Sequence, residues 1–458
     1  METSITPAEN SQPLAPETAT VATAAPVAKA DRIHTVDMIR GFALLGILLM
    51  NIPIFGLDES AFSQILKGSS ENADFKALGF IHIFPDGTMR GLFSMLFGVG
   101  MVLFTLNKTS KPDGPTVAEY YYRRLLWLVL FGVFNAYILL WEGDILFYYG
   151  LAGMLLYPFR KSSPKLLIGL GILCFAINMY KTMGWFGDTK KTRKTYLEAK
   201  AAIAEKKPLT EAQQGAMGRW EEIEKSQTPD TARSKRNIRK MHSGYGTIFS
   251  YFIPDNANNE IWGMYHGIWD FIGMMLIGMG LFWMGFFSNK LATSTYGMLA
   301  LVGYIVGITI GWLAFINGQV EWVRHFSTYI DNWRVPHFLL YDVRRVFISV
   351  GHASLLMLLY RSGLVNWLMR ALANVGQMAF TNYLMQSIIC TWFFFGYGFD
   401  YYNKLRFYQL YYVVLAIWIF QMIFSSIWLR FFRFGPFEWV WRSLTYWKKQ
   451  PMRLKKIV

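Results

Sequence analysis

Charged residues and cysteines are scarce in this sequence. Of its 458 residues, 16% are charged and two are cysteines, whereas 53% are hydrophobic and 17% are aromatic. The low charge argues against an ordinary soluble domain, and the many aromatic residues exclude a disordered chain. Two cysteines are too few for a disulfide framework. Cys174 and Cys390 lie in apolar runs, where we expect them to pack in the core. The composition is that of a protein embedded in a bilayer.

The charge that is present is mostly basic. The 45 Lys and Arg exceed the 30 Asp and Glu, which gives a net charge of +15. Nucleic-acid binding needs a solvated basic face or groove, but here the basic residues are scattered between apolar segments. We therefore expect no nucleic-acid partner, and we attribute the excess to membrane topology.

Long uncharged stretches dominate the chain. A helix needs about 20 apolar residues to cross the hydrocarbon, and flanking Lys and Arg side chains extend shorter ones by snorkelling. The strict alternation of a barrel strand is absent. We therefore predict an all-α, polytopic integral membrane protein with about ten transmembrane helices. The ten uncharged stretches are 41–57, 91–107, 125–141, 145–159, 166–180, 271–289, 291–320, 346–360, 371–399 and 407–429.

The distribution of basic residues predicts the orientation. With the amino terminus inside, 21 basic residues fall in cytoplasmic segments and nine in short outer loops, among them Arg90, Arg344 and Arg345. The positive-inside rule then places both termini in the cytoplasm. We expect the protein in the bacterial cytoplasmic (inner) membrane, with membrane lipids as its immediate partners. The sequence leaves open whether it forms a homodimer.

Composition also divides the chain into segments. Residues 185–260 are the only sizeable polar stretch between apolar runs, and they favour helix broken at Pro208. We expect them to form a polar helical hairpin on the outer side, which either caps a substrate cavity or merely links two bundles. The predicted parts are a disordered arm (1–32), a five-helix bundle (33–184), this extramembrane hairpin (185–260), a second five-helix bundle (261–435) and a cytoplasmic interfacial tail (436–458).

Ionisable residues beside or inside spanning helices are candidates for function because burying them is costly. His266 and Asp270 are spaced i, i+4 at the outer end of the sixth stretch, so they share a helix face. A carboxylate that orients an imidazole is the arrangement of a general base. The alternative is a structural pair. His82, followed by Asp86, is a second histidine on the outer side.

A second group lies at the cytoplasmic end. Asp37 and Arg40 are spaced i, i+3 in the first helix, and Asn51 lies about three turns deeper. Arg123 and Arg124 approach the same leaflet from the third helix. Guanidinium groups suit phosphate oxygens, so these residues are candidates for binding a donor. Topology signalling and snorkelling explain the arginines equally well.

Polar residues elsewhere have structural alternatives. Asp144, with Glu142, lies in a tight outer turn, where it either takes part in substrate binding or proton transfer, or caps the next helix. Asn382 and Gln386 form a polar stripe in the ninth helix that either lines a path or bonds across helices. No His, Cys or Asp spacing matches a metal site.

Several strings resemble a known family. RIHTVDMIRGFALLGILLMNI, YYRRLLWLVLFGVFNAYILLWEGDIL, GQMAFTNYLMQSIIC and RFGPFEWVWRSLTYW are similar, in this order, to the YeiB-like bacterial membrane proteins. The amino-terminal half is distantly similar to transmembrane acyltransferases that include heparan-alpha-glucosaminide N-acetyltransferase. By this resemblance, Asp37, Arg40 and Gly41 occupy a shared first-helix pattern, and His82 is a counterpart of the acetyltransferase histidine. Many family members have His where this chain has Asn135, so a mechanism built on that histidine cannot operate here.

These observations lead to one main hypothesis and two alternatives. The chain is expected to be a transmembrane acyltransferase that uses a cytosolic acyl-CoA as co-substrate, with no bound cofactor or metal. Arg40, Arg123 and Arg124 would hold the donor, and His266 would activate a hydroxyl or amine of a glycan, lipid or small metabolite. The first alternative is a transporter or exporter of an amphiphilic molecule or lipid precursor. The second is a non-catalytic membrane partner that docks through its carboxy-terminal tail.

Overall fold

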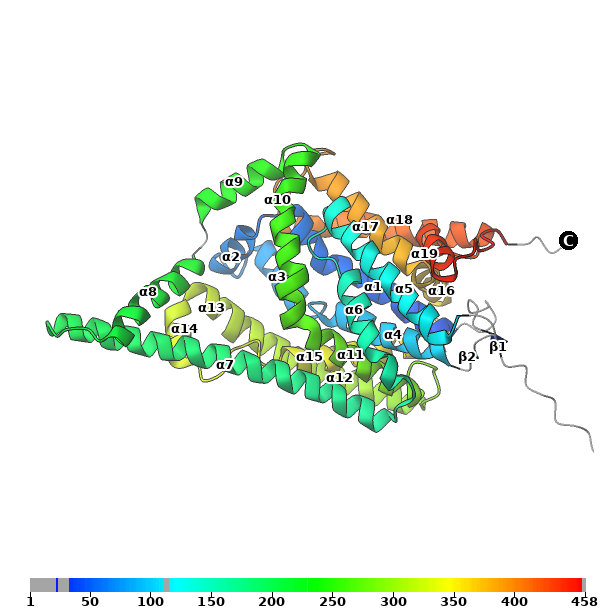
Figure 1. The fold of residues 1–458 in the computed structure, drawn as a ribbon, viewed down its shortest axis with the longest axis horizontal. Coiled ribbons are helices and arrows are strands. Elements are labelled where there is room, and N and C mark those ends of the chain that lie inside the picture. The colour runs from blue at the N-terminus through cyan, green and yellow to red at the C-terminus, as the bar shows by residue number, and fades with distance from the viewer. Residues whose placement is uncertain (1–21, 24–32, 107, 110–114, 229, 455–458) are drawn as a thin grey trace, which may run out of the picture.

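The computed structural model describes residues 22–23, 33–106, 108–109, 115–228 and 230–454. Regular structure in this part is almost entirely helical (Figure 1). Two short strands, β1 (Ala22–Thr23) and β2 (Lys108–Thr109), pair in parallel. The predicted disordered arm, residues 1–32, lies outside the described residues except for β1. The all-α prediction is therefore confirmed as a fold class.

The helices of the first half of the chain include those of the polar segment that begins at residue 185. They are α1 (His34–Gly56), α2 (Ser60–Lys67), α3 (Ala73–Ile83), α4 (Thr88–Thr105), α5 (Val117–Val133), the π-helical turn η2 (Phe134–Ile138), α6 (Leu146–Leu156), the 3₁₀ turn η3 (Tyr157–Lys161), α7 (Pro164–Ala204), α8 (Glu211–Ser226) and α9 (Thr231–Met241).

The second half contains the remaining membrane helices and the carboxy-terminal helix. They are α10 (Tyr245–Asn258), the π-helical turn η4 (Asn259–Gly263), α11 (Met264–Trp283), α12 (Thr293–Leu313), the π-helical turn η5 (Ala314–Val320), α13 (Glu321–Arg324), α14 (Phe326–Asn332), α15 (Tyr341–Ser362), α16 (Asn366–Gln377), α17 (Ala379–Phe394), the 3₁₀ turn η6 (Phe407–Gln409), α18 (Leu410–Phe431) and α19 (Pro436–Tyr446).

Seven helical stretches in the described part are long and apolar enough to cross a membrane. Each coincides with a stretch predicted from the sequence, so the chain has the make-up of a polytopic membrane protein. The seven stretches are His34–Gly56, Ala73–Thr105, Pro164–Ala204, Tyr245–Trp283, Thr293–Arg324, Tyr341–Ser362 and Phe407–Phe431.

The predicted count of ten is not confirmed, because three predicted spans are shorter or interrupted. Over 125–141, α5 passes into the π-helical turn η2, and over 145–159 the helix α6 has 11 residues, or about 16 Å. Over 371–399 the chain breaks at Met378 between α16 and α17. The side of the membrane on which each terminus lies remains a prediction from the basic residues.

Helix α7 crosses the predicted boundary at residue 185 without a break. It has 41 residues, about 60 Å, which is twice the thickness of the hydrocarbon. Its polar half continues as helix because no breaker occurs before Pro208, which lies in the loop ahead of α8. The predicted boundary at residue 260 likewise falls inside η4, which joins α10 to α11. The polar segment is thus a continuation of membrane helices.

Outside the apolar bundle, α8 folds back on this extension of α7 (Figure 1). A second, smaller hydrophobic core forms there, in which Trp220 of α8 stacks on Phe326 of α14 at 5.7 Å between ring centroids. Arg193 of α7 lies over the Trp220 ring and donates two hydrogen bonds to Asp331. This head, the α7 extension with α8, α13 and α14, therefore has its own packed interior.

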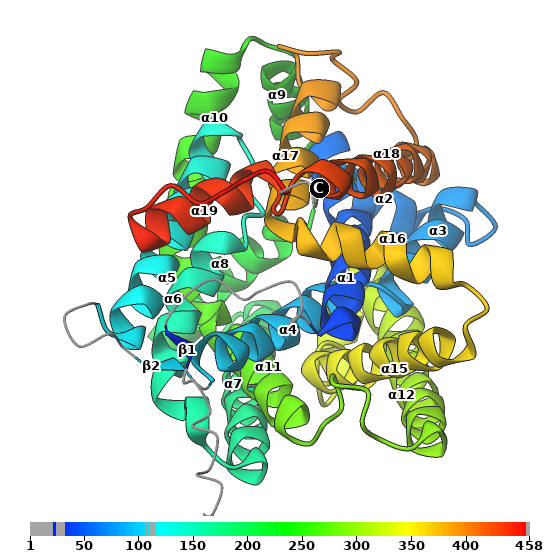
Figure 2. The ribbon, with the colours of Figure 1, turned by 90° about the vertical axis from the view of Figure 1, so that its right-hand side faces the viewer.

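The crossing of α1 and α16 depends on two glycines (Figure 2). A Cβ atom at Gly41 would overlap the carbonyl oxygen of Leu372, and one at Gly376 would overlap the carbonyl oxygen of Asp37. The helices therefore touch backbone to backbone, which is typical of small residues at membrane helix interfaces. This contact explains Gly41 in the Asp-x-x-Arg-Gly string without any role in chemistry.

The carboxy-terminal helix α19 supplies a cap for another helix. The buried carboxylate of Glu438 accepts hydrogen bonds from the backbone N–H groups of Phe380 (2.7 Å) and Thr381 (3.0 Å) at the start of α17. The Thr381 hydroxyl donates to the same carboxylate. These N–H groups have no partner within their own helix. The segment 436–458, predicted as an interfacial tail, thus includes a helix that packs into the fold.

Replacing Gly41 by Ala should destabilise the protein by about 1–3 kcal/mol, because the added methyl forces α1 and α16 apart. Thermal unfolding in detergent would measure the loss. Gly100→Ala is the matched control, since no atom lies within 4 Å of a Cβ at that helical position. Equal midpoints for Gly41→Ala and Gly100→Ala would contradict the proposed contact.

Candidate functional site: a buried ionic network beside a histidine cavity

A network of paired charges lies between α4, α11 and α15. The buried carboxylate of Asp270 accepts a hydrogen bond from Arg90 at 2.8 Å and a second one from Arg345. Arg345 also lies 3.4 Å from Asp342, whose other oxygen accepts from Asn178 of α7 at 2.8 Å. The guanidinium of Arg345 is 1% exposed. Because a buried charge is tolerated only when it is paired, these contacts hold four helices together.

The predicted pair of His266 and Asp270 does not form. Asp270 is taken by Arg90 and Arg345, whereas His266 is exposed and its ring packs edge-on against Tyr265. The i, i+4 spacing placed both on neighbouring turns, but two arginines from other helices compete for the carboxylate. The assignment of His266 as a base oriented by Asp270 is therefore wrong in its geometry.

A second cluster continues the network toward His82. Arg344, next to Arg345 and 2% exposed, donates to the carbonyl oxygens of His82 and Asp86 and lies 3.3 Å from the Asp86 carboxylate. The Tyr341 hydroxyl reaches the same carboxylate at 3.4 Å. His82 Nδ1 lies 3.4 Å from Asp86 Oδ2. The structure thus brings His82 and Asp270 to adjacent arginines of α15, and it pairs His82 with Asp86.

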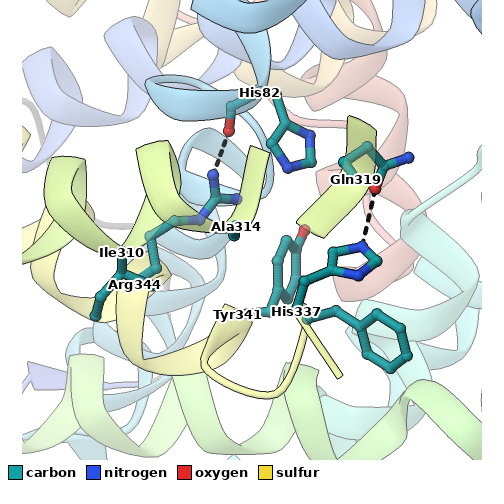
Figure 3. A pocket seen from close by; sticks show the side chains of 8 residues that line it. His82, Ile310, Ala314, Gln319, His337, Tyr341 and Arg344 are labelled. Carbon is teal, nitrogen blue, oxygen red and sulfur yellow. Dashed lines mark hydrogen bonds between the residues drawn. The ribbon is translucent and has the colours of Figure 1, made fainter. Parts of the chain in front are cut away.

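These residues border a cavity of about 220 Å³ (Figure 3). Figure 3 shows the rings of His82 and His337 at its edge, with Gln319 beside His337. The opposite wall is apolar. The lining residues are His82, Ile310, Ala314, Gln319, His337, Phe338, Tyr341 and Arg344. A largely apolar pocket with a few convergent polar groups is the usual form of a small-molecule site.

His337 enters the cavity from the loop that precedes α15. Burial and, to a lesser extent, the nearby His82 lower the pKa of His337 to about 4. Its imidazole is therefore neutral at pH 7. Nε2 lies 3.1 Å from Gln319 Oε1, and Nδ1 lies 3.2 Å from the Tyr329 hydroxyl. Tyr329 belongs to the core of the head, so the polar segment supports one wall of the cavity.

The residues predicted to bind the donor do not line the cavity, and the side chains of the three arginines already contact other groups of the protein. Arg40 pairs with Asp37 at 2.7 Å and is within electrostatic reach of Arg124. Arg124 stacks over the Trp441 ring at 4.1 Å, and Arg123 donates to the Thr445 carbonyl oxygen at 3.4 Å. Both arginines of α5 therefore hold α19. Further along α1, Asn51 is half-buried.

Asp144 caps a helix and also contacts side chains of other elements. Its Oδ2 accepts from the Phe147 N–H at 2.9 Å in the first turn of α6, as a helix cap does. Its Oδ1 accepts from Asn135 at 2.8 Å and lies 3.5 Å from the Tyr383 hydroxyl. Asn135 thus occupies the position beside Asp144 that the resemblance assigns to histidine. Burial raises the pKa of Asp144 to about 7, although the hydrogen bonds from Phe147 and Asn135 oppose the change.

The polar stripe of the ninth predicted helix bonds across helices. Asn382 donates to Ser425 at 2.9 Å, and Gln386 donates to Gln421 at 3.0 Å. Gln421 in turn donates to the Asn382 carbonyl oxygen. These contacts join α17 to α18 in the way that polar residues join membrane helices generally. Both predicted residues have a structural role here.

The sequence alone did not single out Arg90, Asp342, Arg344, Arg345 or His337. Arg90, Arg344 and Arg345 had been counted with the outer loops, but they lie at or within helices and contact carboxylates in the interior. One signal was present: each charge of the network directly precedes an apolar stretch on the same predicted side. Within the described residues, no group of three or more His, Cys, Asp or Glu could hold a metal ion.

Replacing Asp270 by Asn should cost about 3–5 kcal/mol, because Arg345 would keep its buried charge, and Arg90 its half-buried one, without this anionic partner. Thermal unfolding and the yield of folded protein would measure the loss. Asp331→Asn breaks the partly exposed pair with Arg193 and should cost less than about 1 kcal/mol. Similar losses in both variants would show that the network is not a core contact.

The turn before α6 should make stability depend on pH. Burial and, to a lesser extent, the carboxylates of Asp255 and Glu59 raise the pKa of Glu142 to about 7. Between about pH 4 and pH 7 the folded protein then holds a proton that the unfolded chain has lost. Stability should fall as pH rises through this window, by at most ~1.4 kcal/mol per pH unit, and level off above it.

Glu142→Gln should remove the Glu142 part of this slope in a series of unfolding midpoints measured against pH, whereas Asp144, whose pKa burial also raises to about 7, should keep its own part. Glu71→Gln is the control, since Lys76 lowers the pKa of that exposed carboxyl. A slope that Glu142→Gln leaves intact would assign the pH dependence to other groups.

Comparison with known proteins places the chain in a family. Residues 281–448 match a family model described as "Protein of unknown function (DUF418)". The chain is 30% identical over 431 residues to "Uncharacterized protein YxaH" of Bacillus subtilis (strain 168), which covers 93% of this chain and 97% of that protein. It is 29% identical over 424 residues to "Uncharacterized protein YeiB" of Escherichia coli (strain K12), with 91% and 96% covered. No solved structure matches. The chain therefore belongs to the YeiB-like (DUF418) family of membrane proteins.

Proposed function

We propose that this protein is a membrane-bound acyltransferase in which His82 is the general base. The observation that carries the proposal is the His82–Asp86 pair at the edge of the cavity, since a carboxylate beside an imidazole orients the ring and stabilises its charged form. Arg344, at the oxygen that His82 approaches, and Tyr341, at the other oxygen, also contact the Asp86 carboxylate. The first-helix resemblance to transmembrane acyltransferases supports the same chemistry.

The reaction requires one proton acceptor and no metal. With Nδ1 directed at Asp86, the lone pair of His82 Nε2 would take the proton of an acceptor hydroxyl as its oxygen attacks the thioester carbon. The carbon–sulfur bond of the acyl donor then breaks, and the thiolate takes up a proton from the imidazolium. The products are an ester and a free thiol, so atoms and charge balance.

We assign acyl-CoA as the donor class, and the hydroxyl or amine of a glycan, lipid or small metabolite as the acceptor class. Arg40 of α1 and Arg124 of α5 are within electrostatic reach of one another, and with Arg123 they remain the proposed contacts for the donor phosphates. The bacterial cytoplasmic membrane is the proposed location, because a donor of this class is made in the cytosol.

One observation favours a transporter as the second candidate. Arg345 is shared between Asp270 and Asp342, on α11 and α15, and an arginine with two carboxylate partners can exchange them as helices move. Solute flux into proteoliposomes without release of a thiol product would select this function over acyl transfer.

Replacing His82 by Gln should lower acyl transfer by ~10²- to 10⁴-fold, because the proton acceptor is lost. The measurement is release of free CoA from a series of acyl-CoA donors by protein in membranes that contain its acceptors. Asp86→Asn should reduce the rate less. His325→Gln is the matched control, since His325 is exposed and lies outside the cavity. Undiminished CoA release by folded His82→Gln protein would rule out His82 as the base.

A further inference from the structure

The hydroxyl of Tyr329 makes two contacts with one residue. It accepts a hydrogen bond from the backbone N–H of His337 at 2.7 Å and lies 3.2 Å from Nδ1 of the same side chain. On the far side of the ring, Nε2 lies 3.1 Å from Gln319 Oε1. The imidazole is therefore held at both nitrogens, from α14 and from η5.

These contacts select one tautomer. A neutral imidazole carries a single N–H. The Tyr329 oxygen already accepts from the His337 backbone, so its O–H is left to donate to Nδ1, and the ring proton belongs on Nε2. The amide oxygen of Gln319, which can only accept, suits the same tautomer. Nδ1 then has a lone pair, which accepts the Tyr329 O–H. The tyrosine oxygen meanwhile accepts from the His337 backbone, so both contacts of the hydroxyl are satisfied. The low pKa of His337 keeps the ring neutral at pH 7.

Tyr329 cannot turn away from this position. It is 2% exposed, and its ring stacks on Trp333 at 5.2 Å and meets Trp322 edge-on at 5.3 Å. Trp322 also packs against the His337 ring at 5.7 Å. The same aromatic cluster includes Trp220 of α8, so the head as a whole fixes the hydroxyl.

We propose that Tyr329 is a positioning residue that holds His337 as the neutral Nε2–H tautomer, and that a substrate oxygen takes this N–H over from Gln319 when the cavity fills. The inference rests on the proposed function and deepens it. His82 would then act as the base and His337 as a hydrogen-bond donor. The oxygen that suits such a donor is the acyl carbonyl oxygen, on which negative charge develops during attack.

The tautomer can be observed directly by NMR on protein labelled with ¹⁵N in its histidine rings. His337→Gln identifies the signals by their loss. In the wild-type protein we expect His337 to carry its proton on Nε2 and to stay neutral from about pH 5 to pH 8. In Tyr329→Phe the Gln319 oxygen still accepts from Nε2, so we expect Nδ1 to lose its hydrogen bond, its ¹⁵N signal to shift and the ring to titrate closer to the ordinary pKa of histidine.

Two controls isolate the tyrosine. Tyr304→Phe removes the hydroxyl that lies 2.8 Å from His352 Nδ1, a similar pair outside the cavity, and should leave the His337 signals unchanged. Gln319→Met removes the partner of Nε2 but should keep the tautomer, because Tyr329 still donates to Nδ1. Wild-type His337 protonated on Nδ1 or charged at pH 6 would overturn the proposal. So would a tautomer that changes in Gln319→Met, or an Nδ1 signal that stays the same in Tyr329→Phe.

Acyl transfer provides the second readout. Loss of one hydrogen bond that orients the donor should lower kcat/KM of Tyr329→Phe by roughly 3- to 10-fold. Tyr304→Phe should retain the wild-type value. If wild-type protein transfers no acyl group, the proposed function fails while the spectra still decide the tautomer. If transfer occurs and Tyr329→Phe keeps the full rate with an unchanged pH profile, the positioning role fails alone.

Discussion

The pairing of buried charges is the constraint on which this structure depends. A guanidinium or carboxylate in the hydrocarbon region is tolerated only beside an opposite charge. Asp270 meets this requirement for Arg90 and Arg345, so α4, α11 and α15 have to meet at one level. Asn178 brings α7 to the same point through Asp342. The cavity lies next to this point because Arg344, the neighbour of Arg345, also holds the last turn of α3 at His82 and the following turn at Asp86.

The sequence predicted the spanning helices that carry a strong apolar signal. All seven candidate spans were visible as uncharged stretches. The continuity of α7 was not predicted. The sequence indicated helix within residues 185–260 but placed a boundary at residue 185, where the composition turns polar, and α7 continues through this position unbroken. The break at Met378 was not predicted either, because the uncharged run 371–399 continues across it and contains no proline, although Gly376 lies two residues before it.

The site was harder to predict, because partners come from other helices. Helix phase correctly put His266 and Asp270 on neighbouring turns, but it could not show that Arg90 and Arg345 approach the same carboxylate. His82 and Asp86 were visible as a pair, since their contact is local. His337 lies in the loop that precedes α15. Only its contacts with Tyr329 and Gln319, which the sequence does not show, mark it as a candidate. Gly41 is the opposite case. It belongs to a sequence motif that suggests chemistry, but in the structure it serves the backbone contact between α1 and α16.

The cap that Glu438 places on α17 has a consequence for how the chain is assembled. During synthesis α17 emerges some sixty residues before its capping carboxylate, so the N–H groups of Phe380 and Thr381 have no Glu438 to bind when that helix is first made. The bundle can close fully only when α19 leaves the ribosome and returns to α5 and α17. Docking of the last described helix is thus the closing step of folding. A chain that lacks it would leave the start of α17 uncapped, and quality-control proteases can recognise such a site.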